Sequence, residues 1–398
     1  MATTAEYLNK LVGQKNALAD NLVTKGVDAT HDETLDTLVP KVLEISSGGG
    51  GGIYPIDDTG MPAGDVIVPD GVVTSSKIPF NANTNITSLS LPTSLTSISD
   101  NCFEDCTSLQ SVNIPSGVTA IPNRCFSNCT KLTTVPPDNI NEYGSYAFYK
   151  CSNLPTINIP SNCTNIGDYA FEYCKKLKNI TIDKYDSSRT YGMCCFAYCN
   201  SLTNDDIRRI VDNVYSISSY LFEGCTGITD IEVARVWSGM FENCTNLTHA
   251  IAKNTGITGN TGYGVFKGCT KLQEVYLAPN TKKISEQIFY NCTALKTVSL
   301  PSTITEDANS CLTSTSSSYY AFYGCTALED VQLGQDWNMS LRLNVSNNLT
   351  VDSMVAMFNS LKDLTSNTAK TLTLGSTNLA KLTDEQKAIA TNKNWTLA

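Results

Sequence analysis

The sequence predicts an α/β repeat protein: a solenoid with a parallel β-sheet along one face, preceded by a small α-helical N-terminal module. Three observations lead to this prediction. The pattern Phe-x-x-Cys-x-x-Leu, with Ile sometimes in the last place, occurs ten times; an alternating apolar segment follows most copies; and the first 45 residues show helical spacing instead. Repeats of this kind stack, because none of them can bury its apolar side alone.

The repeat runs from Phe103 to the copy at Phe322, with an average interval of about 24 residues. We expect its cysteines to form a ladder of core side chains, because a free cysteine behaves as a small apolar residue. The predicted ladder consists of Cys106, Cys129, Cys151, Cys174, Cys199, Cys225, Cys244, Cys269, Cys292 and Cys325. Three further cysteines precede a repeat Phe, and only Cys163, Cys194 and Cys311 fall outside both positions.

Composition excludes several classes of protein. The chain has 398 residues, 16 cysteines, 2 histidines and a net charge of −10. No basic run supports binding to nucleic acid, and no apolar stretch is long enough for membrane insertion. The N-terminus shows no secretory signal, so we expect synthesis in a cytoplasm that keeps thiols reduced. Three Cys-x-x-x-Cys pairs leave zinc as an alternative, but no histidine accompanies them, and we expect no metal or other cofactor.

A strand is predicted after each motif, because the residues that follow the last Leu alternate between apolar and polar. Leu109–Pro115, Leu272–Leu277 and Leu295–Pro301 are examples. One strand per coil, always in the same direction, predicts a single parallel sheet of about ten strands at ~4.8 Å spacing. The segments Ile86–Pro92 and Asp65–Val72 extend this strand pattern toward the N-terminus.

The unit IGDYAFEYCKKLKNITI, from Ile166 to Ile182, resembles the leucine-rich repeat of the BspA-like (Treponema pallidum-type) family. The resemblance covers roughly residues 65 to 345. It implies a right-handed leucine-rich-repeat solenoid with roles in adhesion or receptor recognition, and it does not imply an enzyme. The residues agree with this last point, because no nucleophile elbow, phosphate-binding loop or metalloprotease motif occurs, and we name no catalytic residue.

Residues 1–45 predict a helical module for oligomerisation or attachment. Its predicted seam has 3-4 spacing, carries Lys15 within it and consists of Leu8, Leu11, Leu18 and Leu22. A helical hairpin that packs on the repeats is the alternative, but the Ser/Gly linker at 46–52 favours a tethered module. The stretch from Tyr7 to Ile45 resembles a short helical region of virion structural and tail-fibre proteins of phages and prophages of Gram-positive bacteria.

The solenoid with its N-terminal cap is assigned to residues 53–345, and a C-terminal capping unit to residues 346–398. A capping unit is expected because a solenoid must shield its last apolar face. Thr350 and Thr383 are predicted N-caps of the two helices in this unit. Together with one helix inside the repeats, the predicted helices are Asn348–Leu361, Leu382–Lys393 and Ser201–Val214.

Two surfaces are candidates for binding. Outward residues in the second half of the predicted sheet add carboxylates and an aromatic ring, which suit a glycan or a protein, although an ordinary solvated face is the alternative. They are Asp230, Glu232, Glu274, Tyr276, Asp330 and Gln332. The longest repeat interval holds the second candidate, a polar loop, because insertions in repeats often lie on the binding face. Its residues are Ser316, Ser317, Ser318, Tyr319 and Tyr320.

These features lead to a first hypothesis, a non-enzymatic virion fibre or adhesin attached to a phage tail or capsid. Its N-terminal helices would form a homo-oligomer, with a trimer favoured, and would contact other virion structural proteins. Its repeats would recognise a glycan or protein on the host cell surface. The alternative hypothesis is a BspA-like adhesin that is secreted or located on a bacterial cell surface.

Overall fold

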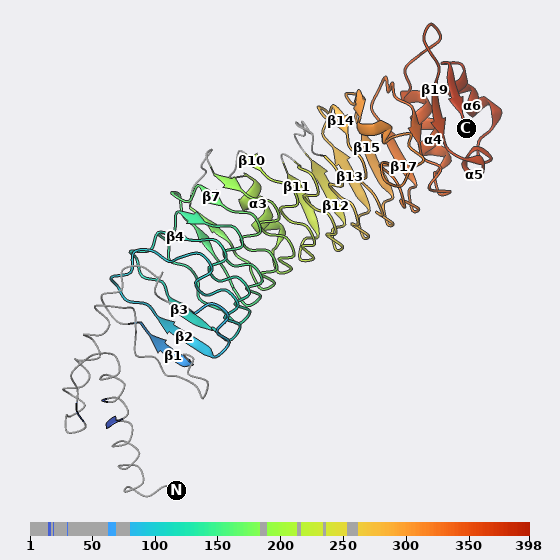
Figure 1. The fold of residues 1–398 in the computed structure, drawn as a ribbon. Coiled ribbons are helices and arrows are strands. Elements are labelled where there is room, and N and C mark those ends of the chain that lie inside the picture. The colour runs from blue at the N-terminus through green and yellow to red at the C-terminus, as the bar shows by residue number, and fades with distance from the viewer. Residues whose placement is uncertain are drawn as a thin grey trace, which may run out of the picture.

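The computed structural model describes residues 63–68, 80–183, 189–212, 216–233, 236–252 and 262–398, together with four isolated positions near the N-terminus. Within these residues the chain forms an elongated stack of coils, with the C-terminal unit at one end (Figure 1). The predicted seam leucines and the Ser/Gly linker lie outside the described residues. The N-terminal module therefore stays a prediction.

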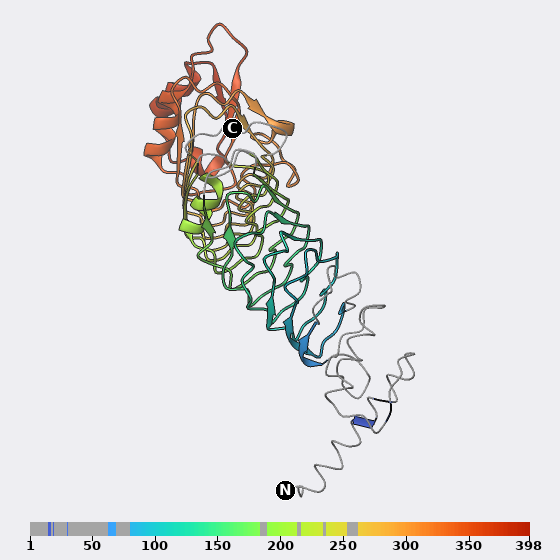
Figure 2. The same ribbon diagram turned by 90° about the vertical axis from the view of Figure 1, so that its left-hand side faces the viewer.

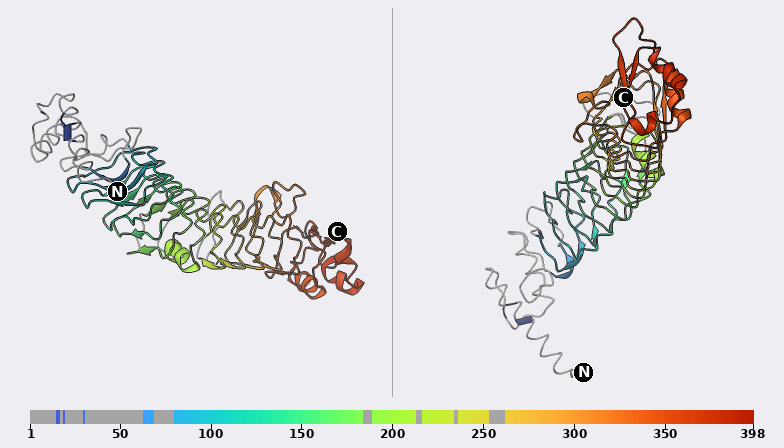
Figure 3. Two further views of the ribbon diagram at one scale, coloured as in Figure 1. Left: turned by 90° about the horizontal axis from the view of Figure 1, so that it is seen from below. Right: turned by 90° about the vertical axis from the view of Figure 1, so that its right-hand side faces the viewer.

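The coils form a solenoid of parallel strands, as the sequence predicted. Every strand pair among the described residues runs parallel. Seen from the side and from below, the strands and turns of successive coils follow one another along a single axis (Figures 2 and 3). The repeat thus determines the architecture through stacking between neighbouring coils.

Among the described residues, the strands predicted from the repeat pattern form three sheets, so the prediction of one continuous sheet was wrong. Each sheet consists of consecutive coils whose backbones pair directly. The first contains β1 (Gly64–Ile67), β2 (Ile86–Ser90) and β3 (Ser111–Asn113); the second β6 (Asn158–Ile159) and β8 (Thr181–Ile182); the third β11 (Asp230–Val233), β12 (His249–Ala252), β13 (Glu274–Leu277), β15 (Thr297–Leu300) and β17 (Asp330–Leu333).

The breaks occur where a side chain takes the place of a backbone acceptor. After β3, the N–H of Val112 donates to the hydroxyl of Thr134 at 2.8 Å, so the next coil adds no strand. After β8, the N–H of Ile180 donates to the carboxylate of Asp206 at 2.9 Å. Asp206 belongs to α3 (Asn204–Asp212), the helix predicted within the repeats, which occupies the position of a strand. The side-chain acceptors thus satisfy backbone N–H groups at the edge of each sheet, but the backbone hydrogen bonding from strand to strand ends there.

We expect Asp206→Ala to lower the free energy of unfolding by about 3 kcal/mol, because the buried N–H groups that it satisfies lose their acceptor. The Asp206 side chain is 0% exposed and also accepts hydrogen bonds from the N–H and hydroxyl of Thr203. Its neighbour Asp205 is the matched control, since that side chain is 71% exposed. Urea unfolding of both alanine variants measures the difference, and equal losses would contradict the assigned role of Asp206.

A second line of strands, not predicted from the sequence, runs along another edge of the stack. Its members are only two residues long, too short for an alternation of period two to be visible. Five of them form one sheet and two form another: β4 (Ala120–Ile121), β5 (Glu142–Tyr143), β7 (Asn165–Ile166), β9 (Thr190–Tyr191) and β10 (Ser216–Ile217), then β14 (Lys283–Ile284) and β16 (Glu306–Asp307).

The repeat phenylalanines form a continuous stack along the core. Adjacent rings lie 5.2–6.2 Å apart between centroids, and the stack begins one coil before the pattern, at Phe80. The pattern misses this first coil because Asn83 replaces the cysteine there. From Phe103 to Phe289 the N–H of each motif Phe donates to a carbonyl of the following coil, as Phe103 does to Cys125 at 2.9 Å. Ring stacking and backbone bonding therefore repeat together.

The ten motif cysteines are buried, and each thiol donates to the carbonyl of the repeat Phe in the preceding coil. The S···O distances are 2.9–3.2 Å, as for Cys174 Sγ and Phe148 O. That carbonyl also accepts the N–H of Cys151 within its own coil. Cysteine thus fills a small apolar site and supplies the second donor to a buried carbonyl, which has two lone pairs.

The turn that carries the motif contains left-handed residues. The second residue after each motif Phe has a positive φ, including bulky residues such as Lys150, Tyr173 and Tyr198, with φ of 60°, 61° and 57°. Such a conformation is uncommon outside glycine. The N–H of each of these three residues donates to a carbonyl of the following coil, for example Tyr198 to Glu223 at 2.6 Å. The bonding between coils therefore stabilises an otherwise unfavourable turn.

The C-terminal unit contains the two predicted helices, α4 (Val351–Ser360) and α6 (Asp384–Thr391). Their N-caps are Thr350 and Thr383, as predicted, and the second forms a capping box with Gln386. The other elements are α5 (Ser376–Leu379), β19 (Lys370–Thr373) and β20 (Trp395–Leu397). The two strands form one parallel sheet with β18 (Leu341–Arg342), which precedes this unit. Ser353 of α4 accepts the N–H of Val331 in β17, which ends the third sheet. In Figures 2 and 3 these helices lie on the same side of the stack as α3.

Candidate binding face on the third sheet

The third sheet, β11 to β17, brings all six predicted face residues onto one surface. Parallel pairing places residues in rows across the five strands, and side chains in alternate positions point to the same side. The first row is Asp230, His249, Glu274, Thr297 and Asp330; the second is Glu232, Ile251, Tyr276, Ser299 and Gln332. We call these ten residues the outer face. Residues between the rows, such as Val275 and Val298, are buried in the core.

Asp230 and His249 interact at one edge of the outer face. The Asp230 carboxylate lies 3.0 Å from Nδ1 of His249, and both side chains are about half exposed. A hydrogen bond from the Thr229 side chain, together with those from His249 and Thr248, holds the pKa of Asp230 below its ordinary value. Asp230 is therefore charged across the neutral pH range and keeps a fixed position, which suits an acceptor for ligand hydroxyl or amide groups.

Ile251 and Tyr276 form an apolar patch in the middle of the outer face. They lie opposite each other on β12 and β13 and are 41% and 37% exposed. Tyr276 donates to Glu274 at 3.4 Å, and burial followed by the Glu274 charge raises the pKa of its phenol. Ile251 was not among the predicted face residues, although the alternation in His249–Ala252 marks it as an outward residue. An exposed apolar centre with a polar rim is the arrangement typical of binding surfaces.

The predicted binding loop is only partly available to a ligand. Ser316, Ser317 and Ser318 are exposed, and Tyr319 is 46% exposed. Tyr320 is 3% exposed and donates its hydroxyl to the carbonyl of Arg342 at 2.6 Å. The inclusion of Tyr320 in the binding loop was therefore wrong. It is a core residue, because its ring packs against Phe322 at 6.3 Å.

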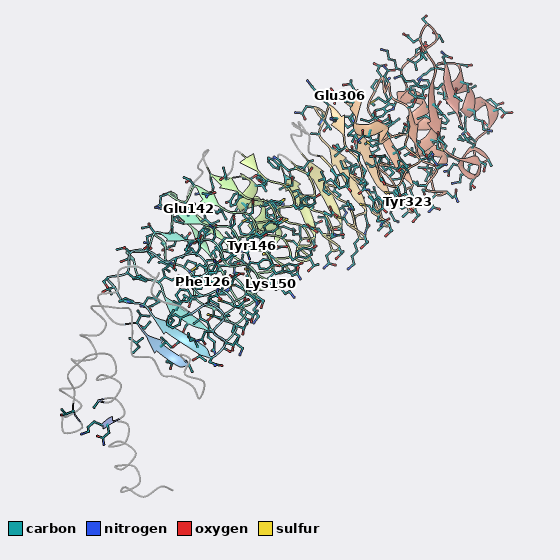
Figure 4. All side chains as sticks on the ribbon, viewed as in Figure 1. Phe126, Glu142, Tyr146, Lys150, Glu306 and Tyr323 are labelled. Carbon is teal, nitrogen blue, oxygen red and sulfur yellow. The ribbon has the colours of Figure 1, made fainter. Side chains whose placement is uncertain are left out.

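A row of tyrosines and carboxylates along the motif turns was also not predicted from the sequence. Tyr173 stacks on Tyr198 with centroids 4.6 Å apart, and the Tyr198 hydroxyl donates to Glu223 at 2.6 Å. Figure 4 shows Lys150 and Tyr323 along this edge and Glu142 and Glu306 along the opposite one. The signal was present, since the aromatic residues recur at fixed offsets from the repeat Phe. The faces of Tyr173 and Tyr198 cover each other, so this pair extends the internal stacking to the surface.

Glu172 in this row gives a pH-dependent prediction. Burial, and then the charge of Glu223, raise the pKa of Glu172 from 4.5 to about 7. The folded protein thus binds more protons than the unfolded chain between these values, and stability decreases as pH rises through this window. We therefore expect the free energy of unfolding of Glu172→Gln to rise by about 1 kcal/mol relative to that of wild type as the pH goes from 5 to 8. This value allows for solvent screening of the half-buried carboxyl group.

Thermal unfolding of both proteins at pH 5 and pH 8 measures this difference. Glu306→Gln is the control, because Glu306 is exposed and the substitution removes the same charge. An equal pH dependence in wild type and Glu172→Gln would contradict the prediction.

The described residues contain no group of three or more His, Cys, Asp or Glu side chains placed to hold a metal ion. Cys163 and Cys311 are fully buried, and Cys194 is 8% exposed. Within the same residues no helix combines the length and apolar character needed to cross a membrane. The outer face itself offers hydrogen bonding, charge and apolar contact.

A parallel solenoid with a short strand in most coils and a buried Leu, Phe and Cys core is the fold of a leucine-rich-repeat protein, a class of typically non-enzymatic binding scaffolds. The sequence model of the BspA type leucine-rich repeat region matches residues 73–203 and 189–318. The chain belongs to this family.

Several solved structures are similar to the chain. A leucine rich cell surface protein from Faecalibacterium prausnitzii is 22% identical over 68% of this chain and 83% of that one, with a TM-score of 0.37. The leucine rich repeat protein of T. pallidum is 22% identical over 42% of this chain and 94% of its own, with a TM-score of 0.31. The pneumococcal vaccine antigen PcpA is 16% identical over 86% and 82%, with a TM-score of 0.40. No match was found among curated proteins.

Proposed function

We propose that the chain is a non-enzymatic adhesion protein of a bacterial cell surface, which binds a glycan or protein through the outer face. The outer face carries the proposal, because it presents Ile251 and Tyr276 within a rim of carboxylates. Membership of a family of repeat-based recognition proteins supports it. A cell surface protein among the similar structures agrees with this location.

The virion fibre is the second candidate, and it depends on the resemblance of Tyr7 to Ile45 to phage structural proteins. That stretch lies outside the described residues, and the family match begins after it. In either setting we propose that residues 1–45 form an oligomeric attachment module and that 46–52 act as a tether. Residues 53–345 would then present the outer face, and 346–398 would close the stack. Light scattering of the full chain and of a chain lacking residues 1–45 tests the proposed homo-oligomer.

Binding of the full chain to immobilised extracellular-matrix proteins and to a glycan array tests the outer face. We expect a double variant, Ile251→Ser with Tyr276→Ala, to weaken binding at least tenfold, since central apolar and aromatic residues dominate most interfaces. The matched control is Ser88→Ala with Ser111→Ala, on β2 and β3 of the first sheet, which should bind like wild type. Equal binding by the two double variants would refute the role of the outer face.

A further inference from the structure

A polar cavity of about 320 Å³ lies near the C-terminal end of the stack, outside the outer face. It is bounded on one side by β16 and the turn after it, and on the other by residues next to β18 and in β19 (Figure 1 shows β19 at this end). We call it the insertion pocket. Its lining residues are Ser302, Ile304, Thr305, Asp307, Ser310, Thr313, Asn338, Met339, Ser340 and Lys370.

The longest repeat interval creates this pocket. After β16 the chain enters the short 3-10 helix η2 (Ala308–Ser310), in which Asn309 and Ser310 both have positive φ. The N–H of Leu312 then donates to the carboxylate of Asp307 at 3.2 Å, and its carbonyl accepts from Arg342 in β18 at 2.9 Å. As a result β16 and β18 belong to different sheets, and the space between them stays open.

The lining is rich in groups that bind hydroxyls. Five lining residues carry hydroxyl groups, and Asn338 adds an amide with both donor and acceptor capacity. The Lys370 ammonium is held by the carbonyl of Asn338 at 2.5 Å. The N–H of Leu312 donates to Oδ2 of Asp307, and Oδ1 accepts no hydrogen bond from the described residues. Ile304 and Met339 provide a small apolar surface beside these polar groups.

We propose that the insertion pocket binds the neutral pyranose end of a carbohydrate. The carboxylate of Asp307 would accept from two adjacent sugar hydroxyls, Lys370 and Asn338 would donate to other oxygens, and Met339 would contact the C–H face of the ring. One carboxylate and one ammonium balance in charge, which disfavours an anion such as phosphate or a sugar acid. The volume is that of a small ligand, at the lower end of the range for binding pockets.

This site goes beyond the proposed function and does not depend on it. No residue of the outer face lines the pocket, so the double variant of Ile251 and Tyr276 should leave pyranose binding unchanged. Loss of adhesion with retained pyranose binding would separate the two sites. The adhesion assay and the pyranose-binding assay therefore test the outer face and the insertion pocket separately, and either proposal can fail while the other holds.

Saturation-transfer difference NMR of the full chain tests the site with the methyl pyranosides of glucose, galactose, mannose and N-acetylglucosamine. We expect at least one to bind saturably, with an affinity on the order of millimolar. Asp307→Asn should weaken that binding about tenfold, since a charged acceptor is lost. Thr305→Trp should abolish it, because the exposed Thr305 side chain lines the pocket and a large ring would fill it.

Asp336→Asn and Thr315→Trp are the matched controls, because both residues are exposed and neither lines the pocket. They should bind the sugar like wild type. Absence of saturable binding for all four pyranosides would overturn the proposal. Binding that survives both Asp307→Asn and Thr305→Trp would equally overturn it, because the sugar would then sit elsewhere.

Discussion

Replacement of Phe171 by alanine is expected to lower the free energy of unfolding by about 3 to 5 kcal/mol, the usual cost of deleting a buried aromatic ring. Phe171 is 0% exposed and stacks between Phe148 and Phe196 at 5.6 and 5.5 Å, with Tyr143 packed edge-on at 5.2 Å. The rings above and below are fixed by backbone bonds between the coils. They cannot collapse into the cavity, so the cost should fall in the upper part of this range.

Urea unfolding followed by circular dichroism measures this loss. Phe171→Leu should cost less, about 1.5 kcal/mol, because most of the apolar volume is kept. Tyr323→Ala is the exposed control, since that ring is 42% exposed. A loss below about 1 kcal/mol for Phe171→Ala would show that the phenylalanine stack does not determine the stability of the solenoid.

The sixteen thiols of the native protein are expected to react with Ellman's reagent at least about a thousandfold more slowly than free cysteine at pH 8. All sixteen are buried. Burial raises the pKa of the Cys225 thiol to about 12, and the pKa of the fully buried Cys174 and Cys199 thiols rises well above the ordinary value. The reactive thiolate is therefore rare even where the reagent can reach the sulfur.

The same assay in denaturant provides the control, because all sixteen thiols should then react within minutes. Cys194, at 8% exposure, should be the first to react in the folded protein. A rapid phase of several thiols in buffer would contradict the burial of the cysteine ladder. A single slow phase assigned to Cys194 by mass spectrometry would agree with it.

Much of the fold could be predicted because the same residue types recur at the same positions of every repeat. The interval between motif residues gave the coil, and the alternation after each motif gave the outward and inward positions of β11 to β17. The breaks between sheets could not be predicted in this way. They depend on whether Thr134 or Asp206 lies opposite a backbone N–H of the preceding coil, which is a matter of three-dimensional register.

The site was predicted less completely, for two physical reasons. The acceptor of each cysteine thiol is a backbone carbonyl, which every residue possesses, so the residue type says nothing about it. Ser316 to Tyr320 were assigned to a loop because the segment is polar, yet Tyr320 returns to the core. Asp307, which was not predicted as a site residue, faces a cavity made with the distant Lys370. Contacts between distant segments of this kind leave no local pattern.

The hydrogen bonds between coils also determine how the molecule would respond to force. They join the motif Phe residues from Phe103 to Phe289 to the following coil and run along the axis of the stack, so a pull on the two ends loads them in series. We expect the coils to detach one at a time, each releasing about 80 Å of contour length for about 24 residues. A protein that tethers a cell in flowing liquid would then lengthen in steps and dissipate tension before its bond to the surface breaks.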